Sequence, residues 1–133
     1  MRALKLKWLL KILQTWINMK VYGIPNCNTV KKATDWLKNN EVAFEFHDYK
    51  KEGIDKGQLQ KWSKKVGWEK LVNKKGTTWR TLPAEEQQKV TDESAAIELM
   101  MQKTSVIKRP VIEAGAKLLV GFDEEEYKNT FKK

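Results

Sequence analysis

Residues 19–40 read MKVYGIPNCNTVKKATDWLKNN, a stretch in which the character of the sequence changes twice. Its apolar beginning is typical of a strand, and this strand ends at the turn formers Pro25 and Asn26. From residue 29 to 39 the apolar side chains recur at the spacing of a helix. We therefore expect a strand followed by a helix, with Cys27 where the helix begins.

Cys27, the only cysteine of the chain, is the first candidate for a reactive residue. A thiol at a helix N-terminus faces unpaired backbone N–H groups and the positive end of the helix dipole, and both favour the thiolate. Asn28 and Thr29 are residue types that cap helix N-termini, and Lys31 and Lys32 follow one turn later. A small buried cysteine of ordinary reactivity is the alternative. The surroundings favour a nucleophile.

The composition bounds the class of protein. A chain of 133 residues with 41% hydrophobic and 32% charged residues suits one soluble globular domain with a single core. One cysteine excludes an internal disulfide framework and fits a reducing compartment, so we expect the cytoplasm. His47 is the only histidine and has no cluster of ligand residues near it in the sequence. We expect no metal, and a structural or surface role for His47.

The first eighteen residues, MRALKLKWLLKILQTWIN, differ from the rest of the chain. They carry four of the nine excess positive charges and an apolar face that is too short and too charged to span a bilayer. We expect residues 1–18 to be an extension or an upstream start, and residues 19–133 to form the domain. The alternative is a helix that binds a membrane surface or a partner. The other lysines are scattered among acids, so we expect no direct nucleic-acid binding.

A second strand is predicted after the first helix, where residues 42–49 alternate between apolar and polar. A strand, a helix and a strand of these lengths imply a parallel pair with a right-handed crossover. Cys27 then lies at the carboxyl end of the first strand, where open α/β sheets bind ligands.

The remainder divides into a helical part and a hairpin. From about residue 51 to 103 the pattern favours helices, with a loop at 74–78. Residues 107–113 and 117–122 are predicted to pair as antiparallel strands around Gly115, followed by a helix to about residue 131. Pro110 cannot donate to a strand ladder, and we expect a cis peptide bond before it.

Several ordered motifs together resemble the arsenate reductase (ArsC) family, which also contains the Spx regulators, and are closest to its uncharacterised YffB-like branch. The resemblance implies an α/β, thioredoxin-like fold with a mixed four-stranded sheet. It also implies a helical insertion, at about 51–103, between a βαβ unit and a C-terminal ββα unit. The motifs that carry it are Tyr22-Gly23-Ile24-Pro25-Asn26-Cys27, His47-Asp48-Tyr49, Gly76-Thr77-Thr78-Trp79-Arg80, Lys108-Arg109-Pro110 and Gly121-Phe122.

The same resemblance implies roles for individual residues. Cys27 matches the nucleophile, Arg109 the arginine before the cis-proline, and Arg80 the arginine of the insertion loop. We expect a thiol-dependent reductase with no bound cofactor, in which Cys27 attacks a small thiol-linked or oxyanion substrate and glutathione or glutaredoxin resolves the adduct. Arg109, Arg80, Lys31 and the N–H groups around Asn28 and Thr29 would hold the thiolate or the substrate.

Two alternatives arise within the same family. An arsenate reductase would carry further arginines and a histidine where this chain has Asn73-Lys74-Lys75, Val120-Gly121-Phe122 and Gly23, so its oxyanion cage is incomplete here. An Spx-like regulator would bind RNA polymerase, but the redox-sensing members carry Cys-x-x-Cys and Val30 occupies the second position.

Overall fold

The computed structural model describes residues 19–131, so the expectations for residues 1–18 lie outside it. No helix within this range is both long and apolar enough to cross a membrane. The strands and helices run in the order β1 (Met19–Gly23), α2 (Asn28–Asn39), β2 (Glu45–Asp48), α3 (Tyr49–Glu52), α4 (Lys56–Val66), α5 (Trp68–Leu71), α6 (Thr77–Arg80), α7 (Ala84–Lys89), α8 (Glu93–Gln102), the 3-10 helix η1 (Thr104–Val106), β3 (Val111–Ala114), β4 (Lys117–Val120) and α9 (Glu124–Phe131).

The four strands form one mixed sheet in the order β2-β1-β3-β4. β1 and β2 are parallel, with Gly23 opposite Asp48, so the parallel pair expected from the sequence is confirmed. β1 pairs antiparallel with β3, and β3 with β4 across the turn at Gly115, whose φ of 62° suits a residue without a side chain. The thioredoxin-like α/β fold is therefore the fold of this chain.

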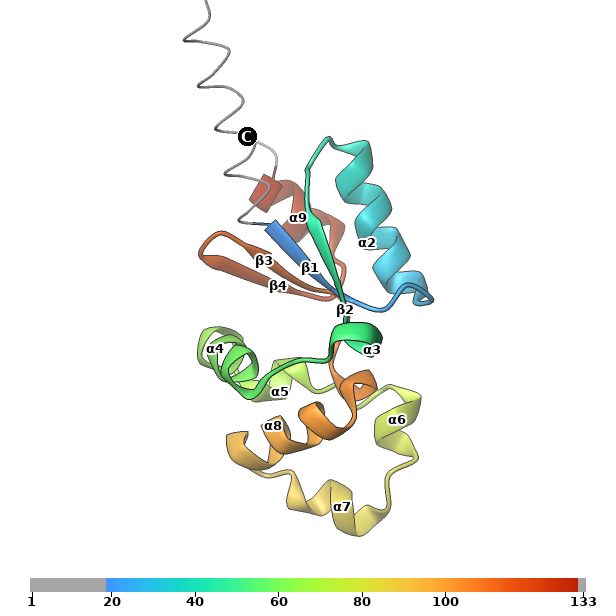
Figure 1. Ribbon diagram of the computed structural model, residues 1–133, viewed down its shortest axis with the longest axis vertical. Coiled ribbons are helices and arrows are strands. Elements are labelled where there is room, and N and C mark those ends of the chain that lie inside the picture. Colours follow the sequence, from blue (N-terminus) through green and yellow to red (C-terminus); the bar gives the residue numbers. More distant parts are fainter. Residues whose placement is uncertain (1–18, 132–133) are drawn as a thin grey trace, which may run out of the picture.

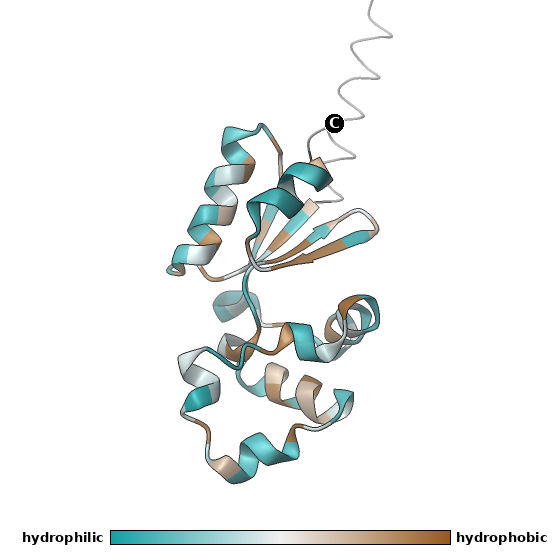
Figure 2. Ribbon diagram, turned by 180° about the vertical axis from the view of Figure 1, so that it is seen from behind, coloured by the Kyte–Doolittle hydropathy of each residue, from teal (hydrophilic) through white to brown (hydrophobic). Residues whose placement is uncertain are grey.

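The two faces of the sheet carry separate clusters of buried side chains. On one face, Val21, Ile112 and Leu119 pack against Leu37 of α2 and Tyr127 of α9. Figure 1 shows these two helices together beside the sheet, with the helical insertion at its other side. Because strand side chains alternate between faces, the residues next to these three point toward the insertion. Figure 2 shows brown apolar segments along β3 and β4, where both faces of the sheet are covered.

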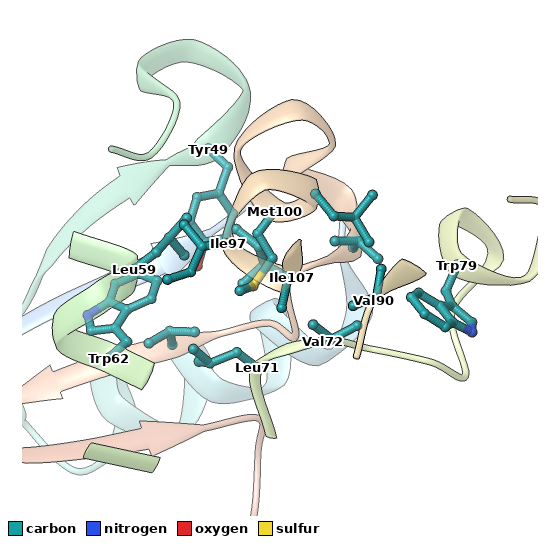
Figure 3. Close-up of a cluster of buried hydrophobic side chains, with 14 of the residues drawn as sticks. Tyr49, Leu59, Trp62, Leu71, Val72, Trp79, Val90, Ile97, Met100 and Ile107 are labelled. Carbon is teal, nitrogen blue, oxygen red and sulfur yellow. The ribbon is translucent and has the colours of Figure 1, made fainter. Parts of the chain in front are cut away.

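The insertion packs around a core of its own that is continuous with the sheet. Leu59, Trp62, Leu71, Met100 and Ile107 each have an exposed fraction of at most 1%. Figure 3 shows these side chains converging from α4, α5, α8 and the segment before β3, with Tyr49 above them. The tryptophan at position 62 is thus a core residue.

Three sequence expectations require correction. The strand expected over 42–49 is shorter, because Asp48 caps α3 by accepting a hydrogen bond from the backbone N–H of Lys50. The loop expected at 74–78 contains the beginning of α6. Residues 107–109 precede β3 and are not part of it, since the strand begins only after the cis peptide bond at Pro110.

One carboxylate joins the sheet to the insertion. Glu113 of β3 accepts hydrogen bonds from the Tyr22 hydroxyl at 2.7 Å, from Nε2 of Gln58 at 2.5 Å and from Nε1 of Trp62 at 3.2 Å. Two of these donors belong to α4 and the third to β1. A partly buried carboxylate needs such donors to compensate for the water that it loses. We therefore regard Glu113 as a structural link between the sheet and α4.

All three tyrosines are expected to resist ionisation in the native protein. Burial raises the pKa of Tyr22, Tyr49 and Tyr127 above its ordinary value of about 10, and for Tyr22 the hydrogen bond to Glu113 adds to this. A raised pKa stabilises the fold fully below about pH 10, and this contribution is lost as the pH rises further. Tyrosinate absorbance should then appear together with loss of the far-ultraviolet dichroism. Titration of one or more tyrosines in a protein that remains folded would contradict this expectation.

Candidate active site

Cys27 lies in the turn between β1 and α2, as the N-cap residue of the helix. Its backbone is extended, with φ −106° and ψ 126°, and its carbonyl accepts the first helical hydrogen bond, from the N–H of Lys31 at 2.9 Å. The side chain is half-buried and free. α2 has no acidic residue in its first turn, so no nearby carboxylate there opposes a thiolate.

The sulfur lies in an environment that favours the thiolate. Partial burial raises the pKa of the Cys27 thiol, but the backbone N–H groups of Val30 and Thr29 lower it. The positive charge of the nearby Arg109 guanidinium lowers it further. The net result is a pKa below the usual value for cysteine. The sulfur makes no side-chain capping hydrogen bond, but the backbone N–H groups of Thr29 and Val30 lie close enough to favour the thiolate.

Arg109, which lies just before β3 in the chain, comes near the thiol in the folded structure. Its peptide bond to Pro110 is cis, as expected from the sequence. One guanidinium nitrogen, Nη1, donates to the carbonyl oxygen of Ser105 at 3.1 Å. The side chain is half-buried. Its backbone belongs to the cis-proline segment and its tip is held by the hydrogen bond to Ser105. This leaves other guanidinium N–H groups for the sulfur or an anionic substrate.

The structure places the other expected site residues differently. Lys31 extends along α2, where its ammonium lies 3.7 Å from the Asp35 carboxylate, and Arg109 is the cation that lowers the pKa of Cys27 most. Arg80 is exposed on α6 in the insertion, and within residues 19–131 no hydrogen bond or ion pair joins its side chain to Cys27. Asn28 is exposed, and Thr29 contributes its backbone N–H.

Sequence reasoning missed one buried residue beside the site. Tyr49 follows β2 directly. Because β1 and β2 are parallel and Gly23 pairs with Asp48, Tyr49 lies at the same edge of the sheet as the turn that contains Cys27. Its side chain is 2% exposed, and its hydroxyl has no hydrogen-bond partner among the described residues. In the sequence Tyr49 is the last residue of the alternating segment. Alternation alone cannot show that Tyr49 already belongs to the next helix.

Comparisons with known proteins identify the family of this chain. A sequence model of the ArsC family matches residues 22–130, which contain both Cys27 and the cis-proline segment. The chain belongs to the ArsC family. An uncharacterised protein of Haemophilus influenzae is 41% identical to this ArsC-family chain over 111 residues, which cover 84% of the chain and 96% of that protein.

Solved structures of related proteins share the fold. The YffB protein is 45% identical, covers 84% of this chain with 97% of its own and superposes with a TM-score of 0.81. An arsenate reductase-related protein from Brucella melitensis is 46% identical, with 87% and 96% coverage and a TM-score of 0.68. An arsenate reductase from Vibrio cholerae is only 13% identical, at a TM-score of 0.69, and so shows the shared fold alone.

Proposed function

We propose that this ArsC-family protein is a thiol-dependent reductase that acts through Cys27 alone and uses glutathione as its co-substrate. The observation that supports this most is the lowered pKa of the Cys27 thiol at the N-terminus of α2, beside Arg109. A thiolate is the nucleophilic form of cysteine, and a fixed guanidinium next to it can also receive an anionic substrate. The chain has no second cysteine, so an external thiol must complete the reaction.

The reaction takes place in two exchanges. The Cys27 thiolate attacks the glutathione sulfur of a mixed disulfide, the S–S bond breaks, and the other sulfur leaves as a thiolate that takes a proton. Cys27 is then joined to glutathione. A second glutathione thiolate attacks that bond, which releases the Cys27 thiolate and oxidised glutathione. In the net reaction one free glutathione thiol takes the place of the released thiol in the disulfide, so the substrate thiol and oxidised glutathione are formed and Cys27 returns to its thiolate. A reducing compartment such as the cytoplasm would supply this thiol.

Alkylation of Cys27 by iodoacetamide across a pH series tests the nucleophile. We expect the midpoint for the full chain to lie below the free-cysteine value of about 8.5. Arg109→Gln should raise it, because the positive charge near the sulfur is lost. Lys31→Gln is the matched control, since this ammonium pairs with Asp35, and it should leave the midpoint unchanged.

The same experiment can contradict the proposal. A wild-type midpoint at or above about 8.5 would mean that the thiol is not activated. The regulator alternative, binding to RNA polymerase without thiol chemistry, would then be the next to examine. A lowered midpoint leads to a substrate comparison in which arsenate is tested beside glutathione mixed disulfides. If arsenate reacts, Lys74 should be substituted next, because a cation of the insertion could help to hold the oxyanion. Its ammonium lies 5.9 and 5.3 Å from the ring centres of Trp68 and Trp79.

A further inference from the structure

A polar pocket lies on the insertion side of the sheet, apart from the candidate active site. Its volume is about 410 Å³, which is within the usual range for small-molecule sites. It is lined by side chains of β1, β2 and the segment that leads into α4, and neither Cys27 nor Arg109 lines it. The six lining residues used below are Lys20, Tyr22, His47, Glu52, Asp55 and Gln58.

The walls of this pocket are held in place by hydrogen bonds. His47 donates from Nε2 to the carbonyl oxygen of Gly53 at 2.7 Å, since a carbonyl can only accept. The rings of His47 and Tyr22 lie 4.8 Å apart and form an aromatic side of the pocket. Tyr22 and Gln58 both donate to Glu113 behind the pocket. The pocket is therefore bounded by side chains with fixed positions.

The hydrogen-bonding groups that remain free are mostly acceptors. Oδ1 of Asp55 accepts from the backbone N–H of Gln58, and Oε2 of Glu52 accepts from that of Asp48, but the second oxygen of each carboxylate has no partner among residues 19–131. Gln58 uses its amide nitrogen for Glu113, which leaves its oxygen free in this part of the chain. Glu52 and Asp55 are exposed, so water can satisfy these oxygens in the empty pocket, but a ligand with N–H donors and a positive charge complements them better than a neutral one.

One cation faces these acceptors. The half-buried Lys20 lies on β1 opposite Glu113 in the β1–β3 register, and no hydrogen bond or ion pair within the described residues holds its ammonium. Glu113 already accepts three hydrogen bonds, and Glu45 lies opposite Lys20 on β2 without an ion pair to it among the described residues. The Lys20 ammonium can therefore still contact an anionic group of a ligand. The pocket thus offers a cation at one position and carboxylates at others.

We propose that this pocket binds a small zwitterion of the amino-acid class, with its ammonium group at Glu52 and Asp55 and its carboxylate at Lys20. The aromatic wall formed by Tyr22 and His47 contacts the chain of carbon atoms between the two charged groups. The site joins β1 and β2 to the start of the insertion, so its ligand holds these elements together.

The test uses nitrogen-15 NMR spectra of the full chain titrated with glycine, 4-aminobutyrate and 6-aminohexanoate, which separate the two charges by increasing lengths. We expect at least one of them to give saturable shifts at Lys20, His47 and Gln58, with a dissociation constant of about 10 mM or lower. Butyrate and butylamine, which each lack one of the charges, should bind at least about fivefold more weakly.

Variants of the pocket complete the test. Asp55→Asn keeps the oxygen that caps α4 but removes the charge, and Lys20→Gln removes the cation. Each should weaken binding at least about fivefold, whereas Lys38→Gln on the far side of α2 should not change it. The proposal fails if no probe gives saturable shifts at about 20 mM, if butylamine binds as well as the zwitterions, or if the shifts centre on Cys27. None of these outcomes bears on the alkylation of Cys27.

Discussion

Cys27→Ser is expected to lower the rate of glutathione-dependent disulfide reduction at least about a thousandfold. A serine hydroxyl is not ionised near neutral pH and cannot exchange with a disulfide, so neither exchange can begin. No second cysteine can substitute for it. The measurement uses the mixed disulfide of glutathione and mercaptoethanol, with the formation of oxidised glutathione coupled to NADPH consumption by glutathione reductase.

The matched control for this loss is the stability of the variant. Cys27 is half-buried and its sulfur makes no capping hydrogen bond of ideal geometry, so the serine variant should unfold at nearly the wild-type denaturant midpoint. Arg109→Gln should retain measurable turnover that falls most at low pH, where its thiolate is scarce. Equal rates for wild type and Cys27→Ser would eliminate the reductase proposal and leave a role that does not depend on the thiol.

Trp62→Ala should destabilise the native state by about 3–5 kcal/mol, the largest effect that we expect for a single core substitution. The side chain is 1% exposed and lies between the sheet and the helices of the insertion. Its removal leaves a cavity there and also deprives the Glu113 carboxylate of one of three hydrogen-bond donors. Chemical denaturation followed by circular dichroism measures the change.

Trp62→Phe separates the two contributions. It keeps most of the buried ring but removes the N–H that donates to Glu113, so we expect a loss of about 1–3 kcal/mol. Lys64→Ala, an exposed substitution on the same helix, should change the free energy of unfolding by less than about 0.5 kcal/mol. A Trp62→Ala variant as stable as Lys64→Ala would contradict the structure of the insertion core.

The order of the elements could be predicted well because each has a local signal. The turn formers Pro25 and Asn26 separate the first strand from its helix, and Gly115 separates the two strands of the hairpin. Boundaries were less predictable where a capping interaction competes with the apolar pattern. Asp48 ends β2 by capping α3. The alternation of side chains from 42 to 49 cannot show whether the strand continues or the helix begins at this residue.

The candidate active site was predictable only in part. Cys27 and Arg109 could be paired from the motifs, because the order of the elements in the family brings the cis-proline segment to the first turn. Lys31 is closer to Cys27 in the sequence than Arg109 is, but its ammonium forms an ion pair with Asp35, four residues further along the helix. Proximity along the chain therefore does not show which cation acts most strongly on the sulfur.

By itself, the sequence determined the strand, turn and helix that present Cys27, the β-hairpin near the C-terminus of the chain and the absence of a second thiol. These depend on local propensities and on composition, which need no knowledge of distant residues. Only the tertiary structure decided that the charge of Arg109 lowers the pKa of the thiol more than that of any lysine, that Glu113 receives donors from two separate elements, and that Lys20 and Asp55 line one pocket. The physical reason is that a pKa, a buried hydrogen bond and a pocket depend on distances between groups that are far apart in the chain, and packing sets these distances.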